Sequence, residues 1–128
     1  MADKKYFTLA EARQLLPVIK EELDQLQALQ NDFQEKFLEL RTLENEDLRF
    51  ELECKLEFLD IQAKMHVNNI NTKGVQLKDI ENGLIDFPAW IEGEEVLLCW
   101  RQGEPDIEYY HGVHDGFRGR KKIDSKLQ

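Results

Sequence analysis

Two histidines stand close together near the end of the chain, in the stretch HGVHD at residues 111–115, and the carboxylate of Glu104 lies shortly before them. Imidazole nitrogens and carboxylate oxygens are ligands that divalent transition metals accept, so Glu104, His111 and His114 form a candidate metal site. The helical HExxH spacing, which would present two histidines on one face, is absent. The same residues therefore also fit a structural polar cluster, in which His111 is hydrogen-bonded to Glu104 or Asp86.

Glycines at positions 112, 116 and 119 precede a basic tail that includes Arg118, Arg120, Lys121 and Lys122. Glycines allow close backbone approach and cations attract anions, so this segment is a candidate anion-binding edge. It matches neither the P-loop nor the dinucleotide fingerprint, and no helix is expected to follow it. A glycine-rich turn followed by a solvated basic tail is the competing interpretation.

Nucleophilic catalysis has few candidates in this sequence. The only serine is Ser125, in the tail, so a serine-hydrolase triad is excluded. Cys99 is expected to be buried in a central strand, where a pair with His111 across adjacent strands is geometrically possible, although buried thiols are normally inert. Cys54 falls in a predicted helix. Two isolated thiols without a CxxC pattern predict a reducing compartment, the cytosol.

The overall composition restricts the class of protein and its partners. A chain of 128 residues predicts one domain, residues 1–128. The net charge of −9 opposes non-specific binding to nucleic acid or anionic membranes, which requires a positive field. No apolar run approaches membrane-spanning length, and no signal peptide is recognised at the N-terminus. We therefore expect a cytoplasmic protein without a membrane or nucleic-acid partner.

Residues 8–72 predict an antiparallel helical hairpin. Thr8 and Glu11 form a capping box at its start, and apolar residues follow from Leu16 at alternating spacings of three and four. Pro17 interrupts the pattern, which predicts a kink there, or a short helix followed by a long one. A charged connection, with Asp47 as an expected N-cap, leads into a second amphipathic helix, and a short connection requires antiparallel packing.

Both predicted helices carry apolar residues outside the main seam, and a two-helix hairpin cannot cover two stripes by itself. This surplus must bury against the remainder of the chain, against a second copy, or against both, which predicts a homodimer. A monomer in which the sheet covers everything is the alternative. The surplus residues are Leu15, Leu29, Leu38 and Leu43 on the first helix and Phe50, Phe58, Ile61 and Met65 on the second. His66 lies near the seam, as a core or boundary residue.

The hydrophobic period changes after Gly74, and residues 74–123 predict an antiparallel meander of three to four strands. Asn82-Gly83 and Glu92-Gly93 are turn signals, and the continuous apolar run at residues 95–101 is typical of a strand buried on both faces. Two helices followed by a meander predict an α+β fold, with the helices laid against one face of the sheet.

Several segments of the chain resemble a bacterial family, the domain of unknown function 2203. They are GVQLKD at 74–79, GLIDFPA at 83–89, LCWR at 98–101, GE at 103–104, YYH at 109–111 and GFRGR at 116–120, with FTL at 7–9 and LLP at 15–17 resembling the N-terminal signature. The resemblance covers nearly the whole chain and implies no established activity. It implies a candidate binding cluster of polar positions: Lys78, Asp79, Asp86, Arg101, Glu104, His111 and Arg120. His114 departs from the family pattern, which favours His111 acting with carboxylates.

Two functional hypotheses follow. The first is a non-enzymatic, self-associating interaction module without a cofactor, which binds a second copy or another protein through its hairpin. The second, from a different class, is a small-ligand or metal-binding enzyme that uses Asp86, Arg101, Glu104 and His111, with a divalent metal as its cofactor. Whether the protein is an enzyme, and on what substrate, is left open by the sequence.

Overall fold

The computed structural model describes residues 4–124, in which a long helical hairpin is followed by a five-stranded sheet. Helix α1 spans Leu9–Thr42 and helix α2 spans Glu46–Asn71. The strands are β1 (Gln76–Asp79), β2 (Leu84–Ile91), β3 (Glu94–Arg101), β4 (Tyr109–Gly112) and β5 (Lys121–Lys122), with a short 3₁₀ helix η1 at Phe117–Gly119. The α+β prediction is confirmed, with one more strand than the three to four expected.

The helix ends follow from local capping. The Thr8 hydroxyl accepts from the Glu11 amide, and the Glu11 carboxylate accepts from the Thr8 amide, so the predicted capping box is present. The second helix is capped by Asn45, which accepts from the Leu48 amide, and not by Asp47, which lies inside the first turn. Helix α1 runs without a break through Pro17, whose side chain is exposed; a kink at this residue stays a prediction.

The sheet is an antiparallel meander in which each strand pairs with its neighbours in the sequence, in the order β1-β2-β3-β4-β5. Strands β2 and β3 are joined by a two-residue turn, in which Glu92 and Gly93 both have positive φ. Such a turn matches the right-handed twist of the strands and fixes their register. It sets Asp86 opposite Cys99 and Phe87 opposite Leu98.

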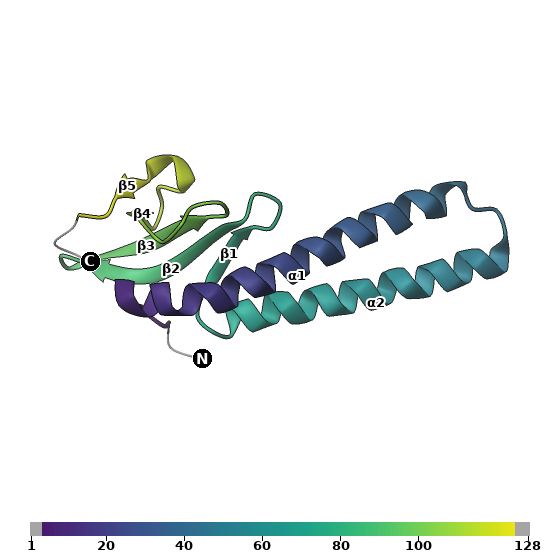
Figure 1. The fold of residues 1–128 in the computed structure, drawn as a ribbon, viewed down its shortest axis with the longest axis horizontal. Helices are drawn as coiled ribbons and strands as arrows, with labels where there is room; N and C mark the ends of the chain where they lie inside the picture. Colours follow the sequence, from purple (N-terminus) through teal and green to yellow (C-terminus); the bar gives the residue numbers. More distant parts are fainter. Residues whose placement is uncertain (1–3, 125–128) are drawn as a thin grey trace.

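The hydrophobic core lies between this sheet and the first half of α1. Because side chains alternate along a strand, Ile85, Phe87 and Ala89 face the helix together with Val96, Leu98 and Trp100 of β3. From α1, Leu16, Ile19 and Leu23 fill the other side of the core. The opposite face of the sheet is covered by the segment that connects β4 to β5 and contains η1 (Figure 1).

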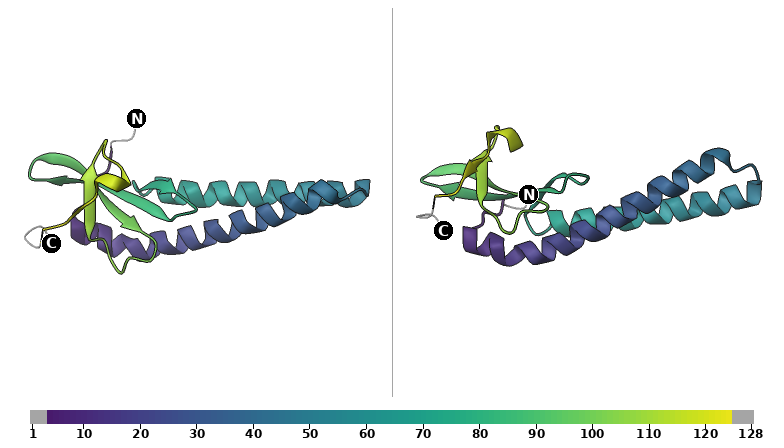
Figure 2. Two further views of the ribbon diagram at one scale, coloured as in Figure 1. Left: turned by 90° about the horizontal axis from the view of Figure 1, so that it is seen from above. Right: turned by 45° about the horizontal axis from the view of Figure 1, so that its top comes forward.

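The hairpin extends well beyond the sheet. Figures 1 and 2 show that the sheet packs against the first part of α1 and the end of α2, whereas the far half of both helices stands clear of it in every view. On α1 burial follows this division, because its buried residues end at Leu26, whereas on α2 Leu52 and Leu56 are buried in the far half. Among residues 4–124, no helix is long and apolar enough to cross a membrane.

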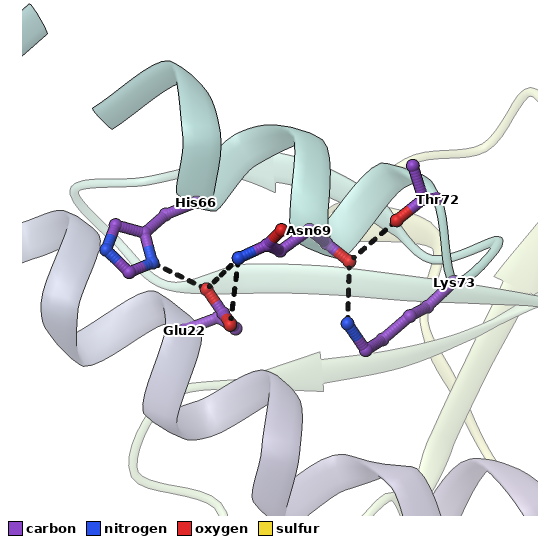
Figure 3. Close-up of polar contacts among 5 residues, drawn as sticks. All are labelled: Glu22, His66, Asn69, Thr72 and Lys73. Atoms are coloured by element: carbon purple, nitrogen blue, oxygen red, sulfur yellow. Dashed lines mark hydrogen bonds and ion pairs between the residues drawn. The ribbon is translucent and has the colours of Figure 1, made fainter. Parts of the chain in front are cut away.

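A polar brace joins the two helices near the sheet (Figure 3). The Glu22 carboxylate of α1 lies 2.6 Å from Nδ1 of His66 on α2 and accepts from the Asn69 amide at 3.3 Å. The Asn69 carbonyl in turn accepts from Lys73 at 3.0 Å and from Thr72 at 3.3 Å. His66 is therefore a boundary residue held by a carboxylate, as the sequence predicts.

Glu22→Gln is expected to lower the free energy of unfolding by about 1–2 kcal/mol at neutral pH, because it removes a charge-assisted hydrogen bond. The hydrogen bond from His66 holds the pKa of Glu22 below its ordinary value of 4.5. A lowered pKa in the folded state gives stability that is fully present above 4.5 and is lost as pH falls through the folded value. The difference between wild type and variant, measured by urea unfolding, should therefore shrink below pH 4.5. Glu21→Gln, at an exposed neighbouring position, is the control, and an equal loss there would contradict the role of the brace.

Candidate functional site

Three chemically reactive side chains meet on the face of the sheet that points away from α1. Asp86 of β2 and Cys99 of β3 are direct cross-strand partners, and His111 of β4 lies diagonally from Cys99. Antiparallel register brings direct partners within about 5 Å at Cβ and diagonal neighbours within about 8 Å. All three side chains are buried, with 2–3% of their surface exposed. The register of the meander alone is thus sufficient to assemble this cluster.

His111 holds a fixed orientation in the cluster. Its Nδ1 lies 2.8 Å from the carbonyl oxygen of Gly112, which can only accept, so Nδ1 carries a proton and donates. Its Nε2 lies 3.1 Å from Oδ2 of Asp86. In the neutral ring, Nε2 therefore carries the lone pair, and it accepts from Oδ2 when the Asp86 carboxyl holds a proton. One ligand atom from each of Asp86, Cys99 and His111 lies within 4.8 Å of the others.

The electrostatics of the cluster reflect its burial. Removal from water raises the pKa of the Asp86 carboxyl, against the lowering effect of His111. Burial, together with the neighbouring Asp86 carboxylate, raises the pKa of the Cys99 thiol to about 12. A thiol with this pKa stays protonated at neutral pH and is a poor nucleophile. Cysteine-based covalent catalysis is therefore not supported by the geometry around Cys99.

A cavity of about 260 Å³ lies directly over the cluster. Its lining includes Asp86, Cys99 and His111, together with Lys78 of β1 and His114. Its apolar lining is made by Leu84, Leu97, Val113 and Phe117. This cavity therefore combines a carboxyl, a thiol and an imidazole with one cation, in a space large enough for an ion and a few attached atoms.

The predicted polar positions divide into separate groups in the structure. Arg120 forms an ion pair with Glu104, and its guanidinium lies 4.0 Å from the centroid of the Tyr109 ring. The other Glu104 oxygen accepts from the Arg101 amide at 2.6 Å, while the Arg101 guanidinium lies over Phe117 at 5.5 Å. These contacts join the turn after β3 to the segment around η1, which forms the roof of the cavity.

Asp79 lies apart from both groups, where its carboxylate accepts from the backbone amide and side chain of Asn82 in the turn after β1. His114 lines the cavity, whereas Glu104 is engaged with Arg120. Among residues 4–124, the group with metal-ligand proximity is Asp86, Cys99 and His111. Cys99 was predicted as a possible partner of His111 but was not among the predicted binding residues. The signal that could have placed it there is the tight turn at Glu92-Gly93, which sets Cys99 directly opposite Asp86.

The far half of the hairpin carries a second candidate site. We define the α2 stripe as Phe50, Cys54, Phe58, Ile61 and Met65, whose spacings of four, four, three and four place them along one side of the helix. Its four large apolar members are exposed by 68%, 62%, 64% and 53% in that order, and Cys54 is also exposed. The sheet does not cover these residues, which confirms that the hairpin holds more apolar surface than its own packing hides.

The fold and the two sites define an α+β protein in which a projecting helical hairpin is joined to an antiparallel meander. The family model described as "Uncharacterized conserved protein (DUF2203)" matches residues 5–123, so the chain belongs to the DUF2203 family. This confirms the resemblance seen in the sequence. Neither the curated proteins nor the solved structures include a significant match to the chain.

Proposed function

We propose that this protein is a self-associating interaction module, in which the α2 stripe of one chain packs against the α2 stripe of a second copy. The observation that carries the proposal is the exposure of that stripe on a helix whose opposite side is already buried. An apolar stripe of this length is rare on the surface of a monomeric protein unless it binds something.

The position of the stripe follows from helix geometry. Each residue turns the helix by about 100°, which places Leu52 and Leu56 on the side that packs against α1. On the same count, Phe58 and Ile61 lie roughly half a turn away from Leu52 and Leu56. The α2 stripe thus faces away from α1, where only another molecule can cover it.

Charge favours an antiparallel second copy as the occupant. The first half of the stripe is flanked mainly by acidic residues, including Glu51 and Glu53, whereas its second half is flanked by Asp60 and Lys64, which form an ion pair at 2.8 Å. Parallel pairing would set the acidic halves against each other, which is destabilising. Antiparallel pairing avoids that repulsion, because it sets the acidic half of each chain beside the Asp60–Lys64 ion pair of the other about a two-fold axis.

The surface available is consistent with such a dimer. Four large side chains that are each more than half exposed amount to roughly 400–500 Å² of apolar surface per chain. Pairing two copies would bury about twice that, and the flanking side-chain stems would bring the total near the ~1,200 Å² at which specific interfaces begin. The expected association is therefore reversible and of moderate strength.

Light scattering coupled to size-exclusion chromatography tests the proposal. At tens of micromolar, the full chain is expected to give a molar mass of twice the 15.1 kDa of a single chain, falling toward that value on dilution. A mass of one chain at every concentration up to the millimolar range would exclude self-association through the hairpin.

The thiols support a location for this module. Cys54 and Cys99 are both free, and Cys54 is exposed within the stripe. An exposed free thiol at an interface is compatible with a reducing compartment, such as the bacterial cytosol, where thiols stay reduced.

A further inference from the structure

We propose that Asp86, Cys99 and His111 form a binding site for one divalent transition-metal ion of the zinc class. A thiolate, an imidazole and a carboxylate are the three ligand types that Zn²⁺ accepts, and three protein ligands with one open position are typical of its reactive sites. The proposed site lies on the sheet, far from the α2 stripe, and is independent of self-association.

The convergence of the three side chains is the first observation. Their ligand atoms lie within 4.8 Å of one another, compared with about 3.5 Å between ligands around a tetrahedral zinc ion at ~2.0–2.3 Å. A contraction of about 1 Å in side chains on three adjacent strands would close the site. Such a contraction requires rotamer adjustment and no change in strand register.

The orientation of His111 is the second observation. Metal-bound histidines usually donate their other ring N–H to a carbonyl or carboxylate, which fixes the tautomer and aims the free nitrogen. His111 has this arrangement already, because Nδ1 donates to the Gly112 carbonyl and Nε2 points to Asp86. A metal ion could therefore take up Nε2 without a change in the contact that holds the ring.

The unsatisfied oxygen of Asp86 is the third and independent observation. Asp86 is 2% exposed, and its Oδ1 has no hydrogen-bond partner among the residues that the structure describes. An unpaired buried carboxyl oxygen is costly to the fold, and a structural Asp86–His111 pair would satisfy only Oδ2. A cation bound between Asp86 and Cys99 would supply the missing partner.

The cavity gives the ion a route and an open coordination position. Space lies directly over the three side chains, and His114 and Lys78 line it. Lys78 would favour an anionic fourth ligand in that space. Metal entry would release the Cys99 proton to solvent, so that a neutral thiol becomes a thiolate ligand.

Cobalt(II) titration of the reduced, full-length protein tests the site, because a cobalt–thiolate bond gives a charge-transfer absorption in the near ultraviolet. One equivalent per chain is expected, and zinc should displace the cobalt. Cys99→Ser should abolish the band and weaken binding by at least about tenfold. Cys54→Ser, which removes the exposed thiol on the hairpin, is the matched control and should retain both. Absence of stoichiometric binding at micromolar metal, or a band that depends on Cys54, would overturn the proposal.

Asp86→Asn separates metal binding from a structural role and keeps the test valid if Cys99→Ser folds poorly. The amide side chain has the same shape and can donate to Nε2 of His111, so the variant should fold with stability near that of the wild type. Its affinity for cobalt should nevertheless fall by at least about tenfold, since an amide carries no charge. Zinc should raise the melting temperature of the wild type by about 5–10 °C at a hundred times its Kd, and that of Asp86→Asn by much less. Equal cobalt affinity in wild type and Asp86→Asn would overturn the site.

Discussion

With the α2 stripe as the proposed dimer interface, Phe58→Glu is expected to be a monomer at concentrations where we expect the wild type to be a dimer. Phe58 is 62% exposed in the single chain and lies in the middle of the α2 stripe. In a two-fold dimer, the substitution removes two aromatic rings from the interface and introduces two carboxylates beside an already acidic flank. Burying an unpaired charge opposes association strongly, so Kd should rise by roughly 100-fold or more.

Light scattering and far-ultraviolet circular dichroism together measure this effect. The helical signal of Phe58→Glu should match that of the wild type, because the position is exposed in the monomer. Trp90→Glu is the control: this aromatic is 54% exposed on strand β2, on the sheet and outside the stripe, and its substitution should leave the dimer intact. If Phe58→Glu stays dimeric, or if Trp90→Glu dissociates as readily, the α2 stripe is not the interface.

Phe87→Ala is expected to lower the free energy of unfolding by about 3–5 kcal/mol. Phe87 is fully buried in β2, between the sheet and α1, and its ring meets Phe7 edge-on at 5.4 Å. The substitution leaves a cavity in the part of the molecule that joins the hairpin to the sheet. Since domains of this kind are stable by only about 5–15 kcal/mol, this one change should remove a large part of the total.

Urea unfolding measures the loss, with Phe58→Glu as the common background so that association does not contribute. Phe50→Ala in the same background is the control, because Phe50 is 68% exposed and its truncation should cost less than about 1 kcal/mol. Equal losses at the two positions would contradict the burial that the structure assigns to them.

Much of the fold could be predicted from the sequence because its signals are local. The capping box at Thr8 and the alternating apolar spacing from Leu16 require only the geometry of one helix. Turn residues at Gly83 and Gly93 marked the ends of β2, and both have positive φ in the structure. Asp47 was wrong as the cap of α2, because Asn45 lies one residue before the helix and is equally suited to the role.

The candidate site was only partly predictable because it depends on register. The pair of His111 with Asp86 was one of two partners foreseen, and the two-residue turn between β2 and β3 is what makes Cys99 the third member. Glu104 was proposed as a ligand on sequence proximity, but it is held by Arg120 from the segment after η1. Contacts between side chains 16 residues apart in two loops leave no periodic signal in a sequence.

The surplus of apolar surface was predictable from the helix pattern, but its location was not. Periodicity shows that α1 and α2 carry more apolar residues than one seam can hold. Which of them the sheet covers depends on how far the hairpin extends beyond it, a tertiary property seen in Figure 1. The sheet covers the first half of α1, whereas Phe50, Phe58 and Ile61 of α2 stay exposed.

Cross-linking of Ile61→Cys through the native Cys54 tests the antiparallel pairing of two stripes most directly. When two copies of residues 50–65 pair antiparallel about a two-fold axis at the middle of this range, Cys54 of each chain lies beside position 61 of the other. Within one chain, the same two positions are about 10 Å apart along the helix, which is too far for a disulfide. Mild oxidation should therefore give a covalent dimer for Ile61→Cys and none for Ile61→Cys combined with Cys54→Ser. Cross-linking that persists without Cys54 would indicate parallel pairing, and no covalent dimer in either variant would contradict the proposed interface.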